Sequence, residues 1–158
     1  MLLCFQVNRP FYNVMTACCS CTFISQFRLY NCAGPKFGIE GIRKLLGVPQ
    51  APLLCTALKP MGKSSEDFAN MAYALAKGGM DIIKDDHGLA NQKWAPFEQR
   101  VALCCDAVLR ANRETGRNCL YAPCLNAPSD QIISRAWYSK DMGAGAVMLL
   151  PGIAGLMQ

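Results

Sequence analysis

The segment Gly-Gly-Met-Asp-Ile-Ile-Lys-Asp-Asp-His-Gly, residues 78–88, passes from the end of one element through a second into a charged loop. The paired glycines are typical of the end of a helix. The mostly apolar run at 80–83 has the length of a buried strand. Lys84, Asp85 and Asp86 follow it directly. Ionisable side chains placed just after a buried parallel strand are typical of a site at the carboxyl end of a sheet.

Units of the same kind lie on both sides of this segment. Apolar runs of strand length occupy 53–58, 80–83, 119–125 and 146–150, and helical patterns occupy 39–46, 64–77, 96–116 and 129–143. Ser64 and Ser129 are predicted as helix N-caps. Alternating strands and helices predict right-handed crossovers and a parallel sheet, which is the α/β class. The pattern alone does not separate a (β/α)8 barrel from a doubly wound sheet.

Composition narrows the function classes. The chain has 158 residues, of which 52% are hydrophobic and 17% charged. This length and composition predict one folded domain and not a disordered chain. The net charge of +5 is spread along the sequence without a basic stripe, which argues against nucleic-acid binding. Polar residues interrupt every apolar run before it reaches the length of a membrane span, so no membrane association is expected.

The first 33 residues differ from the rest. Residues 1–33 contain none of the 11 acidic residues and five of the ten cysteines, and they show no helical or strand period. We expect a cysteine-rich leader at 1–33, without ordered elements, and a folded domain at 34–158. Cysteines in the apolar stretches of that domain are expected to be buried free thiols, as in a reduced, cytoplasmic protein: Cys55, Cys104, Cys105 and Cys119. A plastid location is the alternative, if 1–33 is a transit peptide.

Four motifs in the second region carry a family resemblance. They are Gly-Pro-Lys-Phe-Gly-Ile at 34–39, Thr-Ala-Leu-Lys-Pro at 56–60, the Gly-Gly-Met-Asp-Ile-Ile-Lys-Asp-Asp run at 78–86, and Leu-Asn-Ala at 125–127. In this order they resemble the barrel domain of the RuBisCO large chain, and most closely the RuBisCO-like proteins. The resemblance implies a RuBisCO-type (β/α)8 TIM barrel. A complete barrel takes about 250 residues, so 34–158 is expected to be its first half, with about four strands, in a truncated chain.

The resemblance also implies roles for five residues. Lys59 matches the lysine that handles the proton of the substrate and contacts it. Lys84 matches the catalytic lysine that CO2 converts to a carbamate and that then binds Mg2+. Asp86 and His87 stand at the other two metal-ligand positions, and Asn126 matches a substrate-binding asparagine. The implied cofactors are therefore Mg2+ and CO2, the latter as the lysine carbamate.

Two departures from the carboxylase pattern shape the expected activity. The third metal ligand is a glutamate in the carboxylase, and here the position holds His87, whose nitrogen is a poorer partner for Mg2+. The second lysine after the first barrel strand is also missing, because Met61 and Gly62 follow Pro60. The resemblance therefore implies enolisation or isomerisation of a ketose phosphate, such as a sugar phosphate of methionine salvage, by a homodimer. The alternatives are a Mg2+-dependent ribulose-bisphosphate carboxylase and a non-catalytic remnant.

Overall fold

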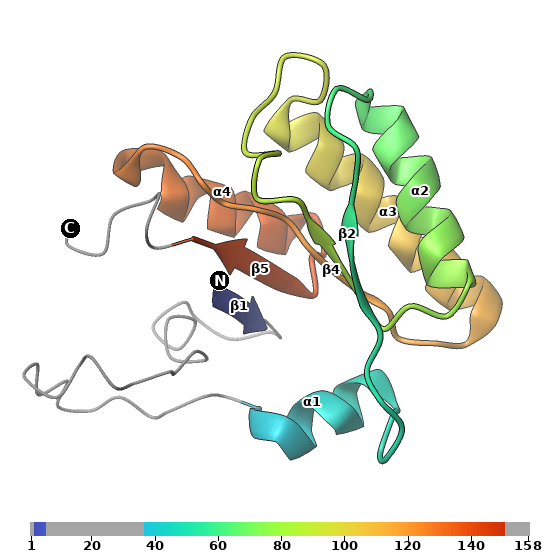
Figure 1. The fold of residues 1–158 in the computed structure, drawn as a ribbon. Coiled ribbons are helices and arrows are strands. Elements are labelled where there is room, and N and C mark those ends of the chain that lie inside the picture. Colours follow the sequence, from blue (N-terminus) through green and yellow to red (C-terminus); the bar gives the residue numbers. More distant parts are fainter. Residues whose placement is uncertain (1, 6–36, 151–158) are drawn as a thin grey trace, which may run out of the picture.

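The computed structural model describes residues 2–5, as backbone, and 37–150 (Figure 1). Its elements, in chain order, are β1 (Leu2–Phe5), α1 (Gly38–Leu46), β2 (Cys55–Leu58), α2 (Ser65–Lys77), β3 (Ile82–Asp85), α3 (Phe97–Thr115), β4 (Leu120–Ala122), α4 (Ser129–Asp141) and β5 (Ala146–Leu149). The alternation of strands and helices from β2 onward confirms the α/β class.

No helix in the described ranges combines the length and the apolar character that a membrane span requires.

The four predicted strands lie side by side in chain order. Strands β2, β3 and β4 form a parallel sheet in which Cys55 pairs with Ile82, and Ile82 with Leu120. Strand β5 continues this order, because the Met148 amide donates to the Pro123 carbonyl at 2.9 Å and its own carbonyl accepts from Leu125 at 2.8 Å. Consecutive parallel neighbours with intervening helices are the arrangement of the first half of a (β/α)8 barrel.

Helices cover one face of this sheet. Figure 1 shows α2 and α3 packed side by side, with α4 continuing the layer behind β5. Leu58, Ile83 and Tyr121 point from successive strands into this layer and are buried. At the start of the edge strand β2, Cys55 is an exposed free thiol, so the prediction that it is buried was wrong.

Local chemistry explains where the helices begin. The Ser64 hydroxyl accepts from the Asp67 amide at 3.1 Å, and the Asp67 carboxylate accepts from the Ser64 amide at 3.2 Å. This reciprocal capping box confirms Ser64 as the N-cap of α2. The prediction for Ser129 was wrong. Pro128 occupies the N-cap position of α4 in an extended conformation, no side chain caps the helix, and Ser129 is its first residue.

Each predicted strand is shifted at one or both ends; for example, β2 begins at Cys55 and β4 ends at Ala122. Two of the differences concern the site and the leader. Strand β3 runs from Ile82 to Asp85, so Lys84 and Asp85 belong to the strand and not to the loop after it. Leu2–Phe5 forms β1, paired antiparallel with β5, although no element was expected in the leader. The remainder of that leader, 6–33, lies outside the described residues.

Candidate functional site

The site begins where β2 and β3 end. The last residues of the two strands, Leu58 and Asp85, are paired in register. The next residues, Lys59 and Asp86, therefore leave the sheet at the same edge. There the Lys59 ammonium lies 3.0 Å from Asp86 Oδ2. Two residues separated by a whole helix thus form an ion pair, because parallel strands bring their carboxyl ends together.

Asp86 is the electrostatic centre of this edge. Its side chain is only 10% exposed, while that of Lys59 is 65% exposed. Its Oδ1 accepts from the Gly88 amide at 3.1 Å and lies 3.4 Å from His87 Nδ1. Burial by itself raises the pKa of Asp86, but the Gly88 amide, the Lys59 ammonium and His87 together outweigh it and lower the pKa. The carboxylate is therefore held ionised, with its charge facing the strand ends.

Lys84 lies beside this pair and makes weaker contacts. Lys84 pairs with Ala57 across the sheet. Because successive side chains of a strand point to opposite faces, Lys84 points to the face opposite Asp85. The side chain is half-buried, and its Nζ donates to the Asp85 carbonyl at 3.4 Å. Within the described ranges it forms no ion pair with Asp86 or with another carboxylate. The Lys84 amine is accordingly not neutralised by a neighbouring acid.

Asn126 joins the edge from the loop after β4. It is buried; its Oδ1 accepts from the Leu150 amide at 3.0 Å, and its Nδ2 donates weakly to the His87 carbonyl at 3.5 Å. The structure thus brings Lys59 and His87 each into contact with Asp86, and it links Asn126 to the same loop. Of the five predicted residues, all of them in the described ranges, Lys84 alone forms no side-chain hydrogen bond or ion pair with the other four.

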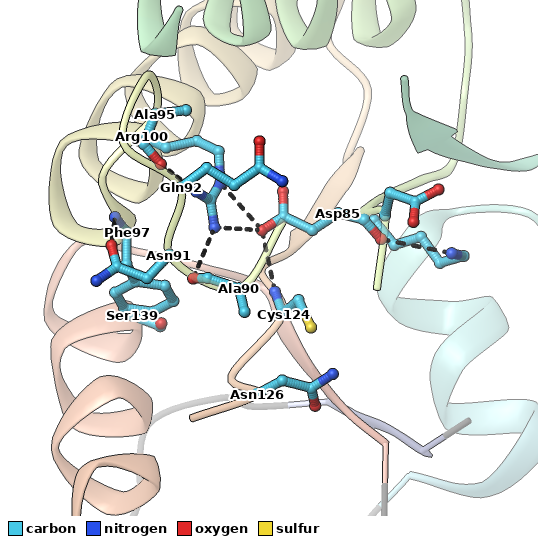
Figure 2. Close-up of polar contacts among 12 residues, drawn as sticks. Asp85, Ala90, Asn91, Gln92, Ala95, Phe97, Arg100, Cys124, Asn126 and Ser139 are labelled. Carbon is cyan, nitrogen blue, oxygen red and sulfur yellow. Dashed lines mark hydrogen bonds and ion pairs between the residues drawn. The ribbon is translucent and has the colours of Figure 1, made fainter. Parts of the chain in front are cut away.

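A buried network behind the site was not predicted (Figure 2). Asp85, completely buried, accepts from the Arg100 guanidinium at 3.1 and 3.3 Å and from the Cys124 amide at 3.0 Å. The Tyr121 hydroxyl donates to its other oxygen at 2.7 Å. Donors therefore engage both carboxylate oxygens, and they tie the end of β3 to α3 and β4.

The same arginine holds the loop that contains His87. Arg100 donates to the Ala95 carbonyl at 2.7 Å and to the Ala90 carbonyl at 3.5 Å. Arg135 of α4 donates to the same Ala90 carbonyl at 3.3 Å and to the Asn126 carbonyl at 2.8 Å. The two arginines therefore fix the backbone around the site. A sequence signal existed for Arg100, because it is a charged residue on the apolar stripe of its helix, beside Phe97 and Val101.

The donor set meets part of what a magnesium ion requires. In the described part of the chain, no three His, Cys, Asp or Glu side chains are grouped as a metal site. The ionised Asp86 supplies one hard oxygen, and Lys84 would supply oxygen only as a carbamate. The nearby His87 Nδ1 offers nitrogen. Of the three positions that the resemblance implies, Asp86 suits Mg2+ as it stands, Lys84 would suit it only as a carbamate, and His87 offers nitrogen, which suits it poorly.

Comparisons with known proteins match this part of the chain. The family description "Ribulose bisphosphate carboxylase large chain, catalytic domain" matches residues 38–157. The 5-methylthioribulose-1-phosphate isomerase of Rhodospirillum rubrum is 40% identical over 123 residues, which are 77% of this chain and 33% of that protein. The chain therefore spans about a third of the length of this curated relative.

Solved structures agree with the sequence comparison. The crystal structure of a RuBisCO-like protein from Rhodopseudomonas palustris matches 78% of this chain and 35% of its own, with a TM-score of 0.75 and 43% identity. The dimeric archaeal RuBisCO from Hyperthermus butylicus matches 73% of this chain and 27% of its own, with a TM-score of 0.69 and 35% identity.

Proposed function

The chain belongs to the ribulose bisphosphate carboxylase large-chain family, and from this membership we propose that the complete protein enolises or isomerises a ketose phosphate. The observation that carries the proposal is the contact of Lys59 with the ionised Asp86 at the carboxyl edge of the sheet. The Rhodospirillum rubrum relative, an isomerase of such a phosphate, supports this substrate class. Because the chain covers a third of that relative, the proposal concerns the whole protein.

Lys59 is the residue proposed to move the proton. Its side chain is exposed at the strand ends, where a substrate can reach it. After its ammonium gives up a proton to solvent, the Lys59 Nζ would accept the proton from the carbon next to the ketone, and the C–H electron pair would pass into the enolate. The Asp86 carboxylate, 3.0 Å away, stabilises the ammonium that results. An isomerase would return the proton from the same Nζ to the neighbouring carbon.

Lys84 and Asp86 are proposed to hold a magnesium ion. CO2 would add to the neutral Lys84 amine, forming an N–C bond with loss of a proton, and the carbamate would supply oxygen ligands. The half-buried Lys84 amine lacks a carboxylate partner in the described ranges, which supports its availability for this addition. When bound, Mg2+ would stabilise the negative charge that develops on the substrate oxygen.

His87 is proposed to influence which reaction occurs, and Asn126 is proposed to bind substrate. The nitrogen of His87 would weaken Mg2+ binding relative to a carboxylate, which favours proton transfer over carboxylation. Asn126 is proposed to contact substrate through its amide nitrogen, whose hydrogen bond to the His87 carbonyl is long at 3.5 Å. The dimeric structure of the Hyperthermus butylicus relative supports a homo-oligomer for the complete protein.

Deuterium exchange tests the proposal. The complete protein, incubated in D2O with a methylthio-ketose phosphate, should introduce deuterium next to the ketone or isomerise the substrate. We expect Lys59→Ala to reduce this rate by about 10²–10⁴-fold, the usual contribution of a positioned acid–base group. Lys63→Ala is the matched control, because Lys63 lies in the same loop and outside the proposed site. Equal rates for Lys59→Ala and Lys63→Ala would contradict the proposal.

A further inference from the structure

Strand β5 has two edges, and its backbone groups alternate between them. The amide and carbonyl of Met148 are bonded to Pro123 and Leu125, on the β4 side. In a β-strand, successive residues direct these groups to opposite edges. The amides and carbonyls of Val147 and Leu149 therefore point away from β4, toward the other edge of β5.

The other edge is occupied by β1. The register pairs Leu2 with Leu149 and Cys4 with Val147, in antiparallel orientation, and Figure 1 shows the two strands side by side. Since Val147 and Leu149 direct their backbone groups to this edge, these two pairs are the hydrogen-bonded ones. The alternate pair, Leu3 with Met148, is not hydrogen-bonded, so the Leu3 amide points away from β5.

This pairing conflicts with the closure of a barrel. In a (β/α)8 barrel every strand has a parallel neighbour on both sides. The neighbour of β5 would be the strand that follows it, and it would use the same groups of Val147 and Leu149. Strand β1 is antiparallel and precedes the family match at 38–157, so it is not a strand of the family barrel.

We propose that the outer edge of β5 is a binding surface for an extended strand and that Leu2–Phe5 of this chain occupies it, in place of the next parallel strand of the barrel. The two strands exclude each other, because each amide and carbonyl of the edge serves one neighbour. The chain therefore has a capped state with β1 in place, and a closed barrel forms only when β1 leaves. In the capped state β1 also covers a sheet edge that would otherwise template association.

Amide hydrogen exchange, measured residue by residue by NMR on the full chain, tests this inference. Val147 and Leu149 should be protected in the unaltered chain. Cys4→Pro removes an amide that the register directs at Val147, so exchange at Val147 and Leu149 should accelerate by at least about tenfold. Met148 should stay protected, because its amide is bonded to Pro123.

Leu3→Pro is the matched control. It places the same residue in the same strand, but at an amide that points away from β5, so protection of Val147 and Leu149 should persist. Unprotected Val147 and Leu149 amides in the unaltered chain would overturn the inference without the need for any variant. Equal acceleration by the two proline variants would also overturn it. So would loss of Met148 protection in Cys4→Pro, because release of β1 should leave the hydrogen bonds between β5 and the β4 side intact.

Discussion

Asp85 lies between Lys84 and Asp86 in sequence, yet its side chain points the opposite way from Lys84, into the interior. Burial raises the pKa of Asp85, and the Arg100 guanidinium, the Cys124 amide and the Tyr121 hydroxyl oppose that rise. Burial lowers the pKa of Arg100 in turn, but the Asp85 carboxylate outweighs it, so that pKa is raised overall. With donors on both of its oxygens, the carboxylate is the form that fits this position. Its role is to hold the strand end from which the site residues project.

Removing Arg100 should therefore cost stability. Arg100→Met leaves the Asp85 carboxylate buried without its charge partner, and we expect the free energy of unfolding to fall by about 3–5 kcal/mol. Arg113→Met, on the exposed face of the same helix, should change it by less than about 0.5 kcal/mol. Urea unfolding followed by circular dichroism measures both. A loss for Arg100→Met no larger than that for Arg113→Met would show that the buried pair does not hold the site.

Helices α2 and α4 begin differently although both have a serine at the start, and this difference can be measured. Ser64→Ala breaks the hydrogen bond to the Asp67 amide and should lower the free energy of unfolding by about 1 kcal/mol. Ser129→Ala removes an exposed hydroxyl that caps nothing, so the change should stay within a few tenths of a kcal/mol. The same urea titration compares them. Similar losses for both variants would contradict the assignment of the caps.

The helices and the four parallel strands could be predicted from sequence because their signals are local. Apolar periods and glycine stops mark each of them, and only the boundaries shifted. Strand β3 extends through Lys84 and Asp85 because their backbones pair with the neighbouring strand β2. Their charged side chains had indicated a loop instead. Strand β1 was not predicted, because its apolar run is only four residues long and its partner β5 lies at the other end of the chain.

The candidate site was predictable in part for a similar reason. Lys59 and Asp86 follow two successive strands, so the parallel sheet places them together, and the ion pair between them agrees with that expectation. Their catalytic and metal-binding roles stay predictions. The Arg100–Asp85 contact was not predicted, because helical periodicity says which face is buried and not which strand residue it meets.

At the scale of the molecule, the described chain is one side of a barrel. Its four parallel strands carry Lys59, Lys84, Asp86 and Asn126 to one edge, and the family match ends at residue 157. The 123 residues that match the Rhodospirillum rubrum isomerase cover 33% of that protein. We propose that this edge, with His87 in place of a carboxylate, supports proton transfer and not the fixation of CO2.

A double-label measurement tests the proposal that this edge supports proton transfer and not the fixation of CO2. The complete protein is incubated in D2O with labelled bicarbonate and Mg2+, once with a methylthio-ketose phosphate and once with ribulose bisphosphate, and the products are analysed by NMR and mass spectrometry. We expect deuterium next to the ketone of the methylthio-ketose phosphate, or its isomerised product, and no carbon label in any product. Labelled carboxylate formed from ribulose bisphosphate as fast as deuterium enters the ketose phosphate would contradict the proposal.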